Sequence, residues 1–127
     1  MLYIKETRKS VDQAFNDLEA SIKQHGFGLL HHYDFKQTLK EKGFELLNEC
    51  LVLDVCNPKQ ACEVLHMDMA INMALPCRIS IYEEKGKTYI GMVPPSVLLG
   101  LVSSSSELRE AAESVEQTTR QIIDDAV

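Results

Sequence analysis

The chain has 127 residues, of which 45% are hydrophobic and 25% are charged, a composition typical of a globular domain and not of a disordered or fibrous chain. This length suits one domain that can bury a core without disulfides or metals, so we expect residues 1–127 to form a single domain. The 13 basic and 19 acidic residues give a formal net charge of −6. That sign is wrong for neutralising a phosphate backbone, which argues against nucleic acid as a partner.

The start of the chain and its apolar stretches bear on location. Residues 1–6 lack the basic stretch and long apolar run of a signal peptide and are typical of a first strand. The longest apolar stretch, Val97–Val102, is too short to cross a bilayer. We therefore expect a cytoplasmic location, no membrane partner, and reduced thiols at Cys50, Cys56, Cys62 and Cys77.

The first third of the chain predicts a strand, a long helix and a second strand. Residues 2–7 form the first strand, and Ser10 with Gln13 matches a capping box before a helix over residues 11–25, which Gly26 ends. Residues 27–35 then alternate between two sides, as strand residues do. One side of this second strand carries Leu29, His31, Tyr33 and Phe35, and the other carries Leu30, His32 and Asp34.

The middle of the chain predicts two short helices around a third strand. A helical stretch over residues 36–42 is closed by Gly43, and residues 46–55 follow as the strand. Asn57 and Pro58 then supply an N-cap and a first helical residue for a helix that ends near His66.

The last part of the chain predicts a hairpin and a long helix. Two alternating runs, residues 75–83 and 88–93, flank a turn, and Pro94 and Pro95 end the second strand before a short apolar segment. The serines at 103–106 are predicted to cap a helix of about 20 residues that begins near Glu107. Its predicted buried face carries Leu108, Ala111, Val115, Ile122 and Ala126, and its solvent face carries Glu110, Glu113, Glu116 and Arg120.

This order predicts an α+β fold. A strand and a long helix are followed by four strands, with short helical insertions in the connections, and then by a second long helix. Because no long crossover separates the last strands, we expect a mostly antiparallel five-stranded sheet with both long helices on one face. The opposite face is left partly open, and such a face must be polar, filled by a ligand or covered by a partner.

Two segments carry a family resemblance. Residues 55–61 are VCNPKQA and residues 75–83 are LPCRISIYE. With the Gly-Phe-Gly at 26–28 and residues 91–94, they resemble the bacterial and archaeal family catalogued as domain of unknown function 302, over nearly the whole chain. The resemblance implies a TATA-binding-protein-like fold of order β-α-β4-α and no assigned activity. Relatives often have Gly at the position of Cys56 and Leu at that of Cys77, which argues against thiol chemistry common to the family.

A first set of candidate ligand-binding residues lies on neighbouring strands. Asp54 and Arg78 fall on the same side of adjacent strands, and Ser80 and Tyr82 continue that side. They could bind an anion or a small polar ligand on the open face, and the alternative is a simple cross-strand ion pair. Asn57 opens a helix whose free N–H groups could bind a phosphate or carboxylate, and the alternative is a cap without a ligand.

The cysteines form a second candidate set. Cys56 ends one strand and Cys77 begins the next, but strand alternation predicts that they face opposite sides of the sheet. Packing as small hydrophobic side chains explains all four cysteines, including Cys62 within the short helix. Cys56 precedes a helix N-terminus, which favours a reactive thiolate, and it is therefore the thiol most worth testing.

Metal and cofactor motifs are weak. Zinc could be bound by Cys56 or Cys77 together with His66, His31 or His32, but no CxxC or HxxxH spacing supports such a site. No nucleotide-binding glycine motif, nucleophile elbow or paired catalytic carboxylate pattern is present, so neither a cofactor nor an enzyme class is indicated.

Two hypotheses of different classes follow. The first is a non-catalytic homodimer that binds a small ligand on its open sheet face, because Val52, Tyr82, Met92 and residues 97–102 present more apolar surface than a thin domain hides. The second is a thiol-dependent redox or sulfur-handling protein in which Cys56 attacks and Cys77 resolves.

Overall fold

The computed structural model describes residues 1–127. In chain order its elements are β1 (Tyr3–Thr7), α1 (Val11–Gln24), β2 (Gly28–Asp34), α2 (Phe35–Glu41), β3 (Cys50–Cys56), α3 (Pro58–Met67), the 3-10 helix η1 (Met69–Ala74), β4 (Cys77–Glu84), β5 (Lys87–Met92), α4 (Pro95–Val102) and α5 (Ser106–Ala126). The five strands form one antiparallel sheet in the order β1-β5-β4-β3-β2. The predicted α+β fold with a five-stranded antiparallel sheet is confirmed.

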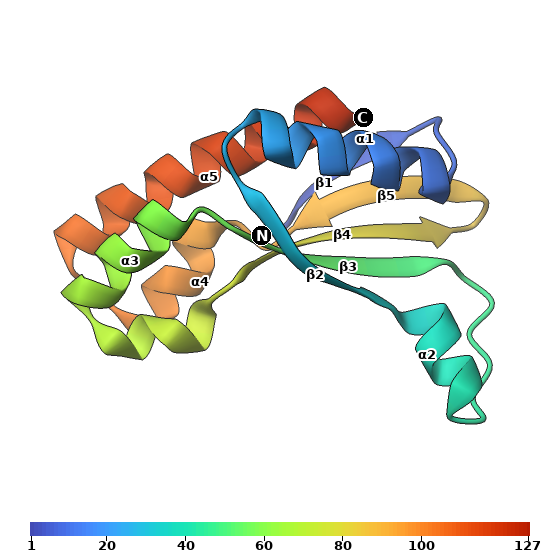
Figure 1. Ribbon diagram of the computed structural model, residues 1–127, viewed down its shortest axis with the longest axis horizontal. Coiled ribbons are helices and arrows are strands. Elements are labelled where there is room, and N and C mark those ends of the chain that lie inside the picture. Colours follow the sequence, from blue (N-terminus) through green and yellow to red (C-terminus); the bar gives the residue numbers. More distant parts are fainter.

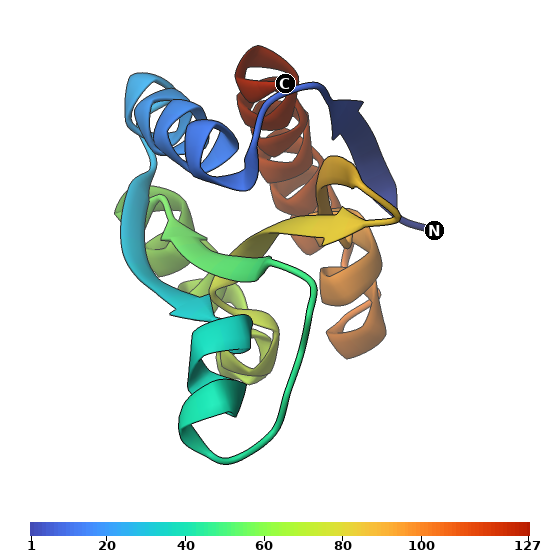
Figure 2. The same ribbon diagram turned by 90° about the vertical axis from the view of Figure 1, so that its right-hand side faces the viewer.

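The two long helices cover one face of the sheet. α1 and α5 lie side by side on that face, and no helix covers the middle of the other face (Figure 1). The view turned by a quarter shows α1 and α5 above the sheet and α2 below it (Figure 2). The inward residues of β3, β4 and β5 pack against these helices. The fully buried residues of this core come from the strands and the helices and include Leu18, Ile22, Leu53, Val55, Ile79, Ile81, Ile90, Ile122 and Ile123.

A second, smaller core lies beyond one end of the sheet. Here α3, η1 and α4 pack against the first half of α5, and we call these three elements the helical lobe. The lobe occupies one side of the molecule in Figure 1. Its core consists of Val64, Ile71, Leu99, Leu108 and Ala112.

The local signals for helix ends are satisfied as the sequence predicts. The Ser10 side chain accepts a hydrogen bond from the Gln13 N–H at 3.2 Å, although the Gln13 side chain bonds Asp17 and does not complete the capping box. Gly26 ends α1 at a φ of 80°, where a residue with a Cβ would be strained. Asn57 caps α3 by accepting from the Gln60 N–H at 3.2 Å, with Pro58 at the first helical position.

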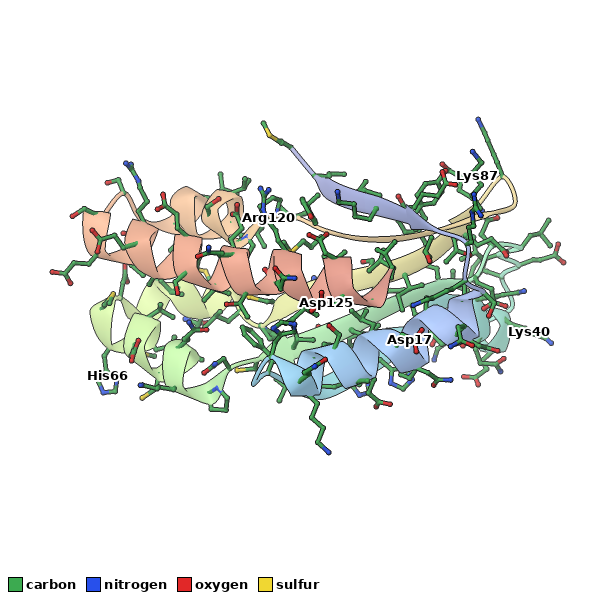
Figure 3. All side chains as sticks on the ribbon, turned by 90° about the horizontal axis from the view of Figure 1, so that it is seen from above. Asp17, Lys40, His66, Lys87, Arg120 and Asp125 are labelled. Carbon is green, nitrogen blue, oxygen red and sulfur yellow. The ribbon has the colours of Figure 1, made fainter.

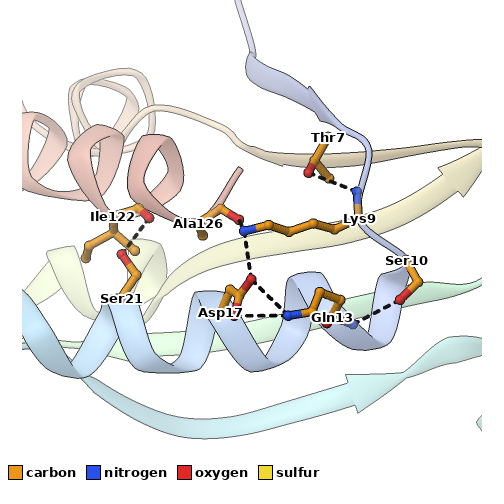
Figure 4. A network of polar contacts seen from close by, with 8 residues as sticks. All are labelled: Thr7, Lys9, Ser10, Gln13, Asp17, Ser21, Ile122 and Ala126. Carbon is orange, nitrogen blue, oxygen red and sulfur yellow. Dashed lines mark hydrogen bonds and ion pairs between the residues drawn. The ribbon is translucent and has the colours of Figure 1, made fainter.

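Polar contacts fasten the end of α5 to α1 (Figure 4). The Lys9 ammonium donates to the Ala126 carbonyl oxygen at 2.8 Å and pairs with Asp17 at 2.7 Å. It thereby places a positive charge at the C-terminus of α5, where the helix dipole favours one. Deeper between the helices, the buried Ser21 hydroxyl donates to the Ile122 carbonyl oxygen at 2.7 Å.

The alternation predicted for the second strand is wrong after Leu29. A bulge between Leu29 and His31 inserts Leu30 as an extra residue, so that Leu29 pairs with Val55 but His31 pairs with Asp54. Leu29 and His32 therefore face the helices, and the His32 ring packs on Phe15 of α1 at a centroid distance of 4.9 Å. Phe35 is not in the strand, because α2 starts there under the Asp34 cap.

Two helical segments were not predicted. η1 follows α3 directly, and the apolar segment after Pro94 is α4. No side chain of its own caps α4; instead, the Glu116 carboxylate of α5 accepts hydrogen bonds from the Ser96 N–H and from the Ser96 hydroxyl. This cap comes from a residue 20 positions away, which a local sequence pattern does not reveal.

Other strand boundaries and buried helix faces also differ from those that the sequence predicts. β3 begins at Cys50 and not at residue 46. On α5, Ala112 is buried where Ala111 was expected, and Glu116 is half-buried under α4 where a solvent-facing residue was expected. Ser105 occupies the N-cap position of α5 without a side-chain hydrogen bond, so the predicted serine cap is wrong in that respect. Met92 belongs to the core and is not part of an open apolar surface.

Candidate functional site

Three polar residues lie in register across the open face. The β2–β3 pairing sets His31 opposite Asp54, and the β3–β4 pairing sets Asp54 opposite Arg78. We call these three residues the open-face row. Nε of Arg78 lies 3.6 Å from Oδ1 of Asp54, which is the ion pair that strand alternation predicts.

Asp54 is the most unusual member of the row. The residue is only 8% exposed, yet its Oδ1 atom receives no hydrogen bond. The Arg78 side chain is 68% exposed, and 3.6 Å is too long for a hydrogen bond from its Nε atom. A buried acceptor without a donor costs about 1–3 kcal/mol, so Asp54 is better suited to receive a donor than to stabilise the fold.

Aromatic side chains lie on one side of the open-face row, toward the end of β3 at Cys50. The Tyr33 ring contacts the His31 ring edge-on at a centroid distance of 4.6 Å. Farther along the same side, Tyr82 lies four residues from Arg78 on β4, and it stacks on Tyr89 of β5 at a centroid distance of 5.3 Å. Burial, and then the nearby charge of Glu84, raises the pKa of Tyr82, which keeps its hydroxyl neutral. The face therefore combines a buried carboxylate with flat apolar surfaces.

Cys56 and Asn57 lie elsewhere, so the predicted ligand-binding residues fall into two groups. Both line an apolar cavity of about 30 Å³ at the junction of the sheet and the helical lobe. Gln60, whose buried Oε1 atom has no hydrogen-bond donor, and Cys77 line it too. A space of this size holds a water molecule and not a metabolite. Asp54, Arg78 and Tyr82 belong to the open face.

The thiols of Cys56 and Cys77 line the same cavity instead of facing apart. The last β3–β4 pair is Val55 with Cys77, so Cys56 lies beyond the ladder within which alternation holds. Burial raises the pKa of Cys56, and burial together with the Cys56 charge raises the pKa of Cys77 to about 11. Both thiols are therefore protonated at neutral pH, which is the opposite of what a nucleophilic thiolate requires.

Cys62 is the cysteine whose surroundings differ most from expectation. It is exposed on α3 and does not pack as a small hydrophobic residue. Its Sγ atom lies 3.5 Å from Nδ1 of His66, and the same ring nitrogen lies 2.7 Å from the Cys62 carbonyl oxygen. The i, i+4 spacing C-x-x-x-H within a predicted helix is a signal that could have found this pair.

The predicted zinc ligands are not brought together. Cys56 and Cys77 lie at the cavity, whereas His66 is on the exposed side of α3 and His31 is on the open face. No group of three or more His, Cys, Asp or Glu side chains could hold a metal ion within the chain. None of the helices combines the length and the apolar character that a membrane crossing needs.

Comparisons with known proteins agree with this picture. The family model described as domain of unknown function DUF302 matches residues 3–126. A crystal structure of an uncharacterized conserved protein DUF302 from Bacillus stearothermophilus superposes with a TM-score of 0.95. It is 32% identical in sequence, and the match covers 99% of this chain and 98% of that one. No curated protein matches. The chain therefore belongs to the family of domain of unknown function DUF302.

Proposed function

We propose that the chain is a non-catalytic homodimeric module that binds a small ligand on its open sheet face, with Asp54 as the central contact. The observation that carries this proposal is the Oδ1 atom of Asp54, which is buried and has no hydrogen-bond donor. A ligand with an N–H donor group that displaces the mostly exposed Arg78 side chain would reach that oxygen, satisfy it and offset its cost.

The surroundings of Asp54 suggest the chemistry of the ligand. A planar cationic group such as an amidinium can donate to a carboxylate in a bidentate manner. Aromatic atoms attached to it would pack against the rings of His31 and Tyr33, which lie beside Asp54 on β2. The net charge of −6 adds long-range attraction for a cation. A cationic aromatic ligand therefore suits the face better than the anion that Arg78 alone would favour.

Two probes of the same shape and opposite charge test the proposal. Benzamidine and benzoate share a flat ring, but only benzamidine carries donors for Asp54. In an NMR titration of the ¹⁵N-labelled chain, we expect benzamidine to shift the backbone amides of residues 52–54 and 78–82. Benzoate should shift them several-fold less at the same concentration.

The matched variants separate the two charges of the ion pair. Asp54→Asn keeps the size of the side chain and should abolish the benzamidine shifts, whereas Arg78→Gln should leave them in place. If benzoate shifts these amides more than benzamidine does, or if Asp54→Asn binds benzamidine normally, a cation site at Asp54 is excluded.

We propose that the homodimer forms through the helical lobe. There Met67, Met69, Met73 and Leu101 are 44%, 67%, 76% and 81% exposed. Large apolar side chains on neighbouring elements mark surfaces that proteins cover with a partner. Size-exclusion chromatography with light scattering should give the mass of two chains at micromolar concentration, and Leu101→Glu should shift the mass toward one chain. A monomer for the unmodified chain contradicts the dimer.

A further inference from the structure

One pair of side chains on the helical lobe has the geometry of half a metal site. Cys62 and His66 are four residues apart on α3, so both project from one face of that helix. Sγ of Cys62 lies 3.5 Å from Nδ1 of His66, and both residues are exposed. His66 lies on the outer side of α3, away from the sheet (Figure 3).

The distance between the two atoms matches a tetrahedral zinc site. With a Zn–S bond of about 2.3 Å, a Zn–N bond of about 2.0 Å and a tetrahedral angle, sulfur and nitrogen lie about 3.5 Å apart. A zinc ion could therefore bind both atoms after the His66 ring turns away from the Cys62 carbonyl oxygen, without a change of the α3 backbone. Thiolate and imidazole are also the ligand types that zinc prefers in proteins.

One chain supplies only half of such a site. No third His, Cys, Asp or Glu side chain of the chain joins Cys62 and His66, whereas structural zinc sites use four protein ligands. A two-fold axis beside α3 would bring the same two residues from a second chain and complete a Cys₂His₂ set. The exposed methionines that follow His66 in sequence, Met67, Met69 and Met73, would be covered by the same approach.

We propose that one zinc ion bridges two copies of the chain through Cys62 and His66 of each copy. This inference rests on the proposed homodimer through the helical lobe. Each Cys62 thiol loses its proton when Sγ binds zinc, so two protons are released for each ion. Each His66 ring binds through Nδ1 as the neutral tautomer with its proton on Nε2. It gives up its present hydrogen bond to the Cys62 carbonyl oxygen.

The test uses the full-length, reduced chain without a histidine tag, with zinc sulfate as the probe. Calorimetric titration should give one zinc ion per two chains. Light scattering and sedimentation should show that zinc tightens self-association by about tenfold or more relative to EDTA, because the ion binds only the dimer. Cobalt(II) in place of zinc should give a thiolate-to-metal absorption band.

The variants identify the ligands. Cys62→Ser and His66→Gln should each remove the zinc effect and the cobalt band, and both residues are exposed, so the fold should be retained. Cys50→Ser changes another incompletely buried thiol outside the helical lobe and should behave like the unmodified chain. One zinc per chain without a change in mass, or normal zinc binding by Cys62→Ser, overturns the bridge.

The outcomes also separate the bridge from the homodimer on which it rests. A dimer in EDTA that zinc does not tighten overturns the bridge and leaves the homodimer intact. A chain that is monomeric both in EDTA and in zinc overturns both. A chain that is monomeric in EDTA and dimeric in zinc supports the bridge and overturns a homodimer that forms without the ion.

Discussion

Among single residues, the proposed ligand site depends on the burial of the Asp54 carboxylate. Asp54 is almost fully buried, but its partner Arg78 lies mostly in solvent and does not donate a hydrogen bond to it. An ion pair of this kind contributes little to stability, while the burial of the charge has a cost. Asp54 is therefore a residue whose removal should not harm the fold.

We expect Asp54→Val to raise the free energy of unfolding by about 1 kcal/mol, because an orphaned acceptor is replaced by a β-branched side chain that suits a strand. Arg78→Met should lower it, because Asp54 is then left without a nearby cation, and the double variant should recover the stability of Asp54→Val. Urea denaturation measures all three. A loss of about 2 kcal/mol or more in Asp54→Val would mean that the carboxylate stabilises the fold.

A glycine provides a second prediction at this scale. A Cβ at Gly91 would lie 3.0 Å from the Tyr3 carbonyl oxygen and 3.0 Å from Cγ1 of Ile4. Gly91→Ala should therefore push β1 away from β5 and cost about 1–3 kcal/mol of unfolding free energy. Gly100→Ala is the matched control, because open space surrounds that position in α4 and alanine favours a helix by up to about 1 kcal/mol. Equal effects of the two changes would contradict this reading of the β1–β5 contact.

At the scale of the elements, ionised carboxylates hold the two long helices together. The hydrogen bond from Lys9, and then that from Gln13, lowers the pKa of Asp17. The hydrogen bond from His25, and then that from Gln121, lowers the pKa of Asp125 on α5. A carboxyl group with a lowered pKa in the folded state stabilises the fold above its unfolded pKa and loses that contribution as the pH falls through its folded pKa.

The free energy of unfolding should therefore fall as the pH is lowered below about 4, the unfolded pKa of an aspartic acid. The double variant Asp17→Asn with Asp125→Asn should be less stable at neutral pH and should show a shallower fall over this acidic range. Denaturation in urea at a series of pH values measures the slope. The same slope in the double variant and in the unmodified chain would show that other carboxylates cause the acid sensitivity.

The elements also show what local patterns can predict. The helix ends that were predicted correctly depend on residues that act on their near neighbours in sequence. These residues are Ser10 and Gly26 for α1, and Asn57 and Pro58 for α3. The bulge at Leu30 depends on how β2 pairs with β3. The alternation of β2 residues by itself therefore predicts the wrong sheet face for His31 and His32. α4 depends on a carboxylate supplied by α5, which no local window contains.

Some features of the candidate site could likewise be predicted from the sequence, and others could not. The pairing of Asp54 with Arg78 follows from strand alternation, because both residues lie within a regular ladder. The burial of Asp54 and the lack of a hydrogen-bond donor to its Oδ1 atom depend on tertiary packing, so the sequence pattern could not predict them. The Cys62–His66 contact could have been predicted, because i, i+4 residues on a helix always face the same side.

At the scale of the whole molecule, the fold leaves two surfaces for function. α1 and α5 cover one face of the sheet, and the other face and the helical lobe are the surfaces to which we assign the ligand and the second chain (Figure 1). A ligand on the open face and a second chain on the lobe would use different surfaces and need not compete. The DUF302 protein from Bacillus stearothermophilus shares this fold, but the proposed function depends on particular residues of this chain.

The central claim is that Asp54 binds a donor group of a ligand on the open face. A crystal structure of the chain with bound benzamidine tests it most directly. We expect the amidinium within hydrogen-bond distance of Oδ1 of Asp54 and the ring against His31 and Tyr33. Benzamidine in the cavity lined by Cys56 and Cys77, or an open face that stays empty at saturating concentration while Asp54 remains buried, would contradict it.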